Sequence, residues 1–212
     1  LHSSLLGAWD LGLHGMLVVT GDPPSMGHLG GMAKLVSDMK SSVELLRLIR
    51  ALREGKMITG EEVGDPPDFC AGCAVGQFSK PQLNWLQKKA EAGAEFVFSQ
   101  PVFHADYFRR LQDSVAGLKL RFFPGVMPLV SRRNAEFLAG GRIPGIRIPD
   151  TVLEKFKSLD SPEDQRRFGL ESAEELCRVI AREARGIYLI MPFGKKCYSD
   201  TASLVRSIRE RV

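Results

Sequence analysis

The sequence of 212 residues has no apolar run long enough to cross a bilayer. Its longest apolar stretch near the C-terminus covers residues 187–193, whereas a membrane-spanning helix needs about 20 residues. The chain also starts without a basic segment followed by a long apolar one, which argues against a signal peptide. These absences predict a protein that has no membrane partner, and we expect it in the cytoplasm.

Cysteine is scarce, with four residues, and this number does not suggest a disulfide scaffold. Cys70 and Cys73 form a CxxC pair, but they lie in a predicted strand, where positions i and i+3 point to opposite faces. No second CxxC is present, and the four histidines are scattered without ligand spacing. We therefore expect a reducing compartment and no metal site.

Basic blocks longer than a few residues are also lacking, although lysine and arginine exceed aspartate and glutamate by 29 − 25 = 4. Such interspersed charge predicts a solvated surface that favours a small anion and does not indicate a nucleic-acid partner. The sequence has no P-loop, no GxGxxG after a strand, no GxSxG and no HExxH. It gives no signal for the nucleotide, hydrolase or metalloprotease sites that these motifs build.

Short apolar runs alternate with amphipathic segments along the chain. The predicted strands cover residues 15–20, 69–75, 95–100, 120–126 and 186–191. The predicted helices cover residues 41–53, 81–92, 105–115, 134–138, 150–159 and 199–211, and a capping box of Ser172 and Glu175 would open one more. Alternating strands and helices predict an α/β protein with a parallel sheet and right-handed crossovers.

The repeat length is typical of a (β/α)8 TIM barrel, which usually has about 250 residues. Five units are present, and three more of about 30 residues each would complete a barrel. We therefore expect residues 1–212 to form a barrel domain that holds five of the eight units and lacks the N-terminal strands. Leu1 in place of methionine fits such a fragment. A five-stranded doubly wound sheet is the alternative.

Ligands bind at the carboxyl ends of the strands in either fold, and few polar side chains stand there. Asp22, between Gly21 and Pro23, is either a turn residue that bonds its own backbone or a carboxylate beside a bound ring. Gln100 ends an apolar strand, where it either braces the next loop or binds the edge of a heteroaromatic ligand. With Asn134, these residues make the sparse polar set that is typical of a small-molecule site.

A more specific signal comes from six segments that follow one another in order. The first four are LVVTGDPP at 17–24, KKAEAGAEF at 88–96 together with SQPVF at 99–103, PGVMPL at 124–129 and RNAEFL at 133–138, and the last two lie at 143–146 and 148–149. Together they resemble the methylenetetrahydrofolate reductase family over nearly the whole chain. The SRRNAEFL and GIYLIMPF stretches look closest to bacterial forms, including those fused to a homocysteine methyltransferase.

The resemblance implies a barrel that binds FAD and carries hydride from NADH or NADPH to 5,10-methylenetetrahydrofolate, giving 5-methyltetrahydrofolate. On this template Thr20, Gly21 and Asp22 contact the flavin, and Asp22 also faces the pterin and tunes both rings. Gln100 binds the pterin, and Asn134 stands at a second polar contact with the substrate. Asp22 and Gln100 are thus the expected catalytic residues.

The same template places further FAD contacts after the second strand and on the helix that follows it. These residues are Gly76, Gln82, Trp85, Lys88 and Lys89. Lysines suit the diphosphate of FAD, although a lysine pair on a helix is also typical of a solvated face. Lys40, at the start of the preceding helix, is a further candidate because helix N-termini favour phosphates.

The sequence departs from the family pattern at two places. The first three strands of the family, with the glutamate proposed there as general acid, have no counterpart, and Gly76 stands where a flavin-packing side chain is usual. The alternative is a non-catalytic subunit that binds FAD or folate, or pairs with a partner covering an open sheet edge. We also expect a homo-oligomer or fusion to a methyltransferase domain. An unrelated barrel aldolase would need a lysine at a strand end, and none stands at the five predicted ends.

Overall fold

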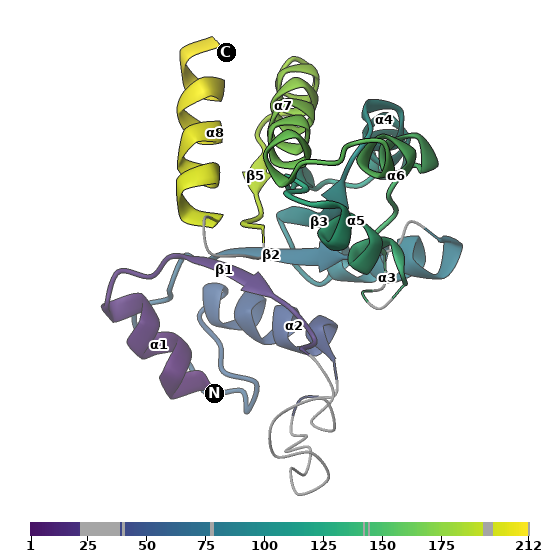
Figure 1. The fold of residues 1–212 in the computed structure, drawn as a ribbon. Helices are drawn as coiled ribbons and strands as arrows, with labels where there is room; N and C mark the ends of the chain where they lie inside the picture. Colours follow the sequence, from purple (N-terminus) through teal and green to yellow (C-terminus); the bar gives the residue numbers. More distant parts are fainter. Residues whose placement is uncertain are drawn as a thin grey trace, which may run out of the picture. The chain divides into compact units, whose positions relative to one another are not determined.

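The computed structural model of the chain describes residues 1–21, 39, 41–76, 79–141, 143, 145–192 and 197–211. Strands and helices alternate along this part (Figure 1). The strands are β1 (Gly15–Val18), β2 (Cys70–Val75), β3 (Phe96–Val102), β4 (Arg121–Val126) and β5 (Tyr188–Leu189). The helices are α1 (His2–Asp10), α2 (Ser42–Arg53), α3 (Lys80–Glu91), α4 (Ala105–Val115), α5 (Arg132–Ala139), α6 (Asp150–Lys157), α7 (Pro162–Ala181) and α8 (Cys197–Arg211).

The five strands form one sheet in the order β1–β2–β3–β4–β5. β1 pairs in parallel with β2, with Gly15 opposite Cys70, and β4 pairs in parallel with β5, with Gly125 opposite Tyr188. A doubly wound sheet reverses its strand order at one point, whereas this order follows the chain throughout. The α/β prediction is therefore confirmed, and the sequential order is that of consecutive units of a (β/α)8 barrel.

The capping box predicted at Ser172 is wrong. Helix α7 begins at Pro162, where the Ser161 hydroxyl accepts a hydrogen bond from the Asp164 N–H at 3.0 Å. Serine at the N-cap, proline at the first position and two acidic residues in the first turn make a stronger helix start than Ser172 offers. The Ser172 hydroxyl lies inside the helix and donates to the Phe168 carbonyl at 2.7 Å.

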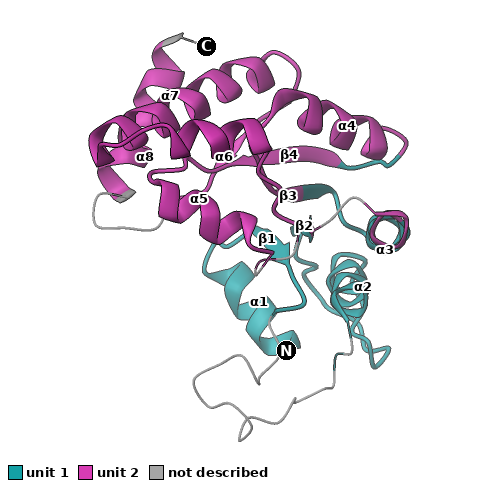
Figure 2. Ribbon diagram, turned by 45° about the vertical axis from the view of Figure 1, so that its right-hand side comes forward, with its two compact units in different colours: residues 1–74, 84–97, 118–120 teal, residues 75–83, 98–117, 121–212 magenta. Residues whose placement is uncertain are grey.

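The chain divides into two compact units, within each of which the residues contact mainly one another (Figure 2). Unit 1 holds residues 1–74, 84–97 and 118–120, and unit 2 holds residues 75–83, 98–117 and 121–212. In unit 1, helix α2 buries one face and the β2 strand supplies small buried side chains. The buried side chains of α2 are Ser42, Val43, Leu46, Leu48, Ile49 and Leu52. Among the described helices none is long and apolar enough to cross a membrane.

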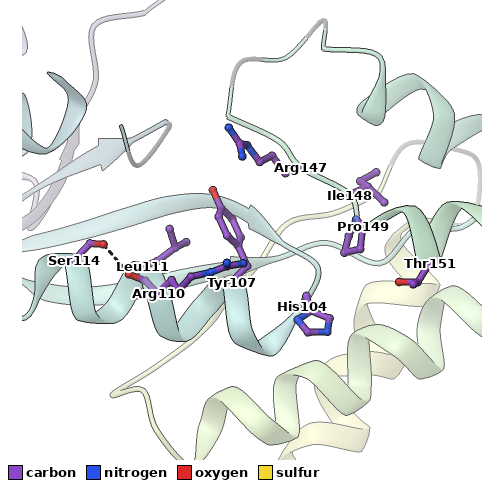
Figure 3. A pocket seen from close by; sticks show the side chains of 9 residues that line it. All are labelled: His104, Tyr107, Arg110, Leu111, Ser114, Arg147, Ile148, Pro149 and Thr151. Atoms are coloured by element: carbon purple, nitrogen blue, oxygen red, sulfur yellow. Dashed lines mark hydrogen bonds between the residues drawn. The ribbon is translucent and has the colours of Figure 1, made fainter. Parts of the chain in front are cut away.

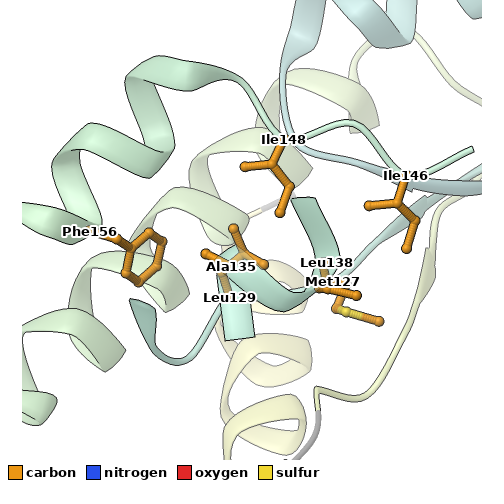
Figure 4. Close-up of a cluster of buried hydrophobic side chains, with 7 residues drawn as sticks. All are labelled: Met127, Leu129, Ala135, Leu138, Ile146, Ile148 and Phe156. Carbon is orange, nitrogen blue, oxygen red and sulfur yellow. The ribbon is translucent and has the colours of Figure 1, made fainter. Parts of the chain in front are cut away.

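Unit 2 contains a cluster of buried hydrophobic side chains around α5 and the segment before α6 (Figure 4). Its members are Met127, Leu129, Ala135, Leu138, Ile146, Ile148 and Phe156. Burying a large aliphatic or aromatic side chain stabilises a fold by about 1.5–3 kcal/mol. Because Ile146 and Ile148 are each only 9% exposed, the cluster fixes the segment 145–149 and leaves Arg147 exposed between them.

Candidate active site

Gln100 lies near the carboxyl end of β3, and its backbone is held by two neighbouring side chains. The Ser99 hydroxyl donates to the Gln100 carbonyl at 2.7 Å and accepts a hydrogen bond from the Gly125 N–H at 3.1 Å. The Tyr188 hydroxyl donates to the Ser99 carbonyl. These three hydrogen bonds fix the backbone from which the half-buried Gln100 side chain extends.

Tyr188 reaches Ser99 because a glycine makes room for its ring. The Tyr188 ring stacks on Phe98, with centroids 4.4 Å apart and planes at 13°. A Cβ at Gly125 would lie 2.7 Å from the Tyr188 ring, so a larger residue at position 125 would displace it. Burial raises the pKa of Tyr188 to about 12, so the phenol stays neutral and remains a hydrogen-bond donor at physiological pH.

Replacing Tyr188 with phenylalanine should lower the free energy of unfolding by about 1–2 kcal/mol, because the Ser99 carbonyl loses its donor. The phenol ionises near pH 10 in the unfolded chain and at about 12 in the folded one. The unfolded state then binds fewer protons in this window, so the contribution of Tyr188 to stability falls as pH rises from 10 to 12. Urea unfolding of both proteins at neutral pH and near pH 11 measures this contribution as their difference.

Tyr198 provides the matched control, because this tyrosine is 75% exposed on α8. Tyr198→Phe should leave both the stability and its pH dependence unchanged. If the gap between the native chain and Tyr188→Phe stayed constant across the alkaline range, the role assigned to the buried phenol would be wrong.

Gly145 brings the segment 145–149 against Gln100 and Gly76. Its φ of +92° lies in the left-handed region, which favours glycine. A Cβ at this position would lie 2.5 Å from the Gly76 carbonyl oxygen and 3.1 Å from the Gln100 Cγ. Unit 2 thereby brings together two of the predicted site residues, Gly76 at the end of β2 and Gln100 on β3.

Two other predicted residues of unit 2 are placed differently. Asn134 is buried in the first turn of α5, and its Oδ1 accepts a long hydrogen bond of 3.4 Å from the Val130 N–H. Its own N–H donates to the Ser131 hydroxyl at 3.1 Å. The amide oxygen of Asn134 thus braces the loop before α5. Gln82 is exposed on α3.

In unit 1, some of the predicted site residues follow β1 and others lie on α3. The Thr20 hydroxyl is 3.4 Å from the Ser42 hydroxyl at the start of α2, and Gly21 has a φ of +74°. Lys88 Nζ lies 4.8 Å from the centre of the Trp85 ring. Asp22 and Lys40 lie outside the described residues.

Lys89 has a structural partner. Its Nζ donates to the Ala74 carbonyl at 2.8 Å, near the carboxyl end of β2. The two lysines therefore have different environments. Lys89 binds the end of a strand, and Lys88 lies over the exposed Trp85 indole.

Comparison with known proteins shows the family of the chain. The model of the family "Methylenetetrahydrofolate reductase" matches residues 1–191. The chain belongs to the methylenetetrahydrofolate reductase family. The resemblance seen in the ordered sequence segments is thus confirmed.

Curated relatives carry the same name. A probable methylenetetrahydrofolate reductase (NADPH) of Caenorhabditis elegans is 26% identical over 178 residues, which are 79% of this chain and 24% of the relative. Methylenetetrahydrofolate reductase 2 of Schizosaccharomyces pombe is 25% identical over 201 residues, which cover 84% and 28%. Methylenetetrahydrofolate reductase (NADH) 1 of Arabidopsis thaliana is 26% identical over 181 residues, which cover 80% and 29%. The chain thus spans about a quarter of the length of these relatives.

A solved structure shares the fold. It is an uncharacterized protein from Clostridium thermocellum that binds two copies of 5-methyl-5,6,7,8-tetrahydrofolic acid. The match has a TM-score of 0.52 at 14% identity and covers 71% of this chain and 56% of that one.

The sequence did not predict the contacts that Tyr188 and Gly145 make in this member of the methylenetetrahydrofolate reductase family. Tyr188 is the one polar side chain in the apolar segment 187–191, and Gly145 follows a proline, a turn signal. Either feature marks the residue as unusual, but neither identifies its partner.

The described part of this family member contains no cluster of three or more His, Cys, Asp or Glu side chains that could hold a metal ion. Cys73 is buried in β2, and burial raises the pKa of its thiol to about 11. A neutral thiol is a poor metal ligand and a poor nucleophile.

Proposed function

We propose that the chain forms the flavin- and folate-binding part of an enzyme that reduces 5,10-methylenetetrahydrofolate to 5-methyltetrahydrofolate with NADH or NADPH. One observation supports this most directly: a braced glutamine stands near the carboxyl end of a strand, against the bare backbones of Gly76 and Gly145, in a chain of this family. Relatives named for NADPH and for NADH leave both reductants open. The free thiols Cys70, Cys73 and Cys177 suit the reducing cytoplasm, where we expect it to work.

Gln100 has the chemistry to hold the folate. A glutamine amide offers two N–H donors and one carbonyl acceptor, which complement the mixed edge of a pterin. Because Ser99 and Tyr188 fix the backbone, less conformational entropy is lost when Gln100 binds. Asn134 would add a second amide. Its oxygen already accepts a hydrogen bond from the Val130 N–H.

The described residues also fit a flavin. A Cβ built at Gly21 in unit 1 or at Gly76 in unit 2 meets no atom within 4 Å, so each unit by itself has bare backbone after a strand that a flat ring can approach. Lys88 would supply a cation for the FAD diphosphate. When bound, FAD would pass hydride from the reduced nicotinamide to the folate. Thr20, Asp22, Lys40, Gln82, Trp85 and Lys89 remain proposed contacts.

The first test is the absorption spectrum of the purified chain after incubation with FAD and removal of unbound cofactor. We expect the visible bands of a bound flavin, and we expect 5-methyltetrahydrofolate to change them. Gln100→Ala should keep the flavin bands and lose the response to folate. A chain that retains no flavin would contradict the proposed FAD site, and its binding of folate would then be measured by calorimetry.

Asp22 tests catalysis as distinct from binding. In the complete enzyme, Asp22→Asn should slow the oxidation of the reduced flavin by methylenetetrahydrofolate more than its reduction by NAD(P)H, because the carboxylate is proposed to face the pterin. Rapid-mixing measurements of the two half-reactions give the two rates. Equal losses would assign Asp22 a structural role, and a native chain that binds flavin but carries out neither half-reaction would favour the non-catalytic alternative.

A further inference from the structure

A pocket of about 560 Å³ in unit 2 is lined by residues that none of the proposed flavin or folate contacts include (Figure 3). One wall is α4, and the other is the segment that leads into α6. The lining residues are His104, Tyr107, Arg110, Leu111, Ser114, Arg147, Ile148, Pro149 and Thr151. The volume lies within the range of about 300–1,000 Å³ that small-molecule sites occupy.

The walls of this pocket are positively charged. Arg110 on α4 and Arg147 on the facing segment contribute two guanidinium groups, and none of the nine lining residues is acidic. Figure 3 shows the Tyr107 ring rising from α4 toward Arg147, with the Arg110 side chain extended along the helix. Tyr107 therefore presents a planar ring and a hydroxyl beside the two cations.

The Asp106 carboxylate at the start of α4 is engaged with another partner. Asp106 lies 3.2 Å from the Arg109 guanidinium, which also binds Glu183 at 2.8 Å. Arg110 and Arg147 form no ion pair with any residue that the structure describes. Within the described ranges, both cations are thus available to a ligand.

The backbone that carries the two arginines is fixed by packing before any ligand arrives. Helix α4 buries Phe108, Leu111 and Val115, which fixes the position of the Arg110 backbone along the helix. Ile146 and Ile148 are buried in the cluster shown in Figure 4, and Arg147 between them is exposed. A ligand would therefore meet a site whose backbone is already ordered.

We propose that this pocket binds a small organic anion that carries a planar ring. The guanidinium groups would hold a phosphate or a carboxylate, because their N–H donors match the oxygens of either group. The ring would stack on Tyr107. The anion could come from a nucleoside phosphate or from an aromatic dicarboxylate. This inference does not depend on the proposed reductase activity.

Calorimetric titration of the whole chain at low ionic strength tests the proposal with two probes, adenosine 5′-monophosphate and N-benzoylglutamate. We expect at least one of them to bind at about 1 mM or below. Arg110→Gln and Arg147→Gln should each weaken that binding by about tenfold, because each removes a charge-assisted hydrogen bond. The preferred probe identifies the source of the anion as phosphate or carboxylate.

Arg185→Gln is the matched control, because Arg185 is exposed in unit 2 and lies outside the pocket. It should leave binding unchanged. Tyr107→Leu should weaken the probe that binds more than it weakens inorganic phosphate, which has no ring. The proposal fails if neither probe binds, or if the probe binds the Arg110→Gln and Arg147→Gln variants as tightly as it binds Arg185→Gln. Circular dichroism checks that all variants remain folded.

Discussion

Replacing Gly169 with alanine is expected to lower the free energy of unfolding by about 3 kcal/mol or more. Gly169 is buried in α7, where a Cβ would overlap the Leu129 carbonyl oxygen and lie 2.7 Å from the Leu129 carbonyl carbon. These are backbone atoms, so no side-chain rotation can relieve the clash. Leu129 belongs to the buried cluster of Figure 4, and α7 would have to move away from it.

Gly7 gives the control of opposite sign. It lies in α1, and a Cβ at this position would meet no atom within 4 Å. Gly7→Ala should raise the free energy of unfolding by about 0.5–1 kcal/mol, because alanine has the higher helix propensity. Urea unfolding measures both changes. Losses of similar size in the two variants would show that the contact with Leu129 is not what makes Gly169 necessary.

Replacing Gly145 with alanine is expected to affect both stability and the candidate site. The φ of +92° costs a non-glycine residue about 1–2 kcal/mol, and the contact of the new Cβ with the Gly76 carbonyl oxygen adds to this loss. The segment 145–149 would retreat from Gln100. We therefore expect folate binding to weaken by about tenfold, which corresponds to about 1.4 kcal/mol.

Gly141 separates the two causes. Its φ is +72°, but a Cβ there would meet no atom within 4 Å, so Gly141→Ala carries the backbone strain without the clash. Urea unfolding should show the smaller loss for Gly141→Ala, and titration with 5-methyltetrahydrofolate should show unchanged binding. If the two variants lost folate affinity equally, the approach of Gly145 to Gln100 would have no role in binding.

The elements were largely predictable because the signals for them are local. The amphipathic pattern of α4 and the short apolar runs of the strands each lie within one segment of sequence. The structure has the elements in the predicted order. The prediction failed where two local signals competed, as at Ser161 and Ser172 for the start of α7. It also gave β5 too great a length, since only Tyr188–Leu189 form the strand.

A site residue was predictable only where its own type is unusual for its place in the sequence. Gln100 is conspicuous as an amide at the end of an apolar strand. By contrast, the hydrogen bond from Tyr188 joins residues 89 positions apart, and the Lys89 ammonium binds a carbonyl 15 positions earlier. Such pairings depend on which strands become neighbours, and no local pattern encodes them. The roles of Asp22 and Lys40 stay predictions.

The alternation of buried and exposed residues at 146–148 has a consequence for how this family member can vary. Surface loops usually accept insertions and deletions, because their side chains are not tied to a core. Here Ile146 and Ile148 are buried on either side of the exposed Arg147. Adding or removing one residue would turn the arginine inward and an isoleucine outward, as a register slip does in a strand. The loop between Gly145 and Pro149 thus has a fixed length, and homologues should differ there by substitution only.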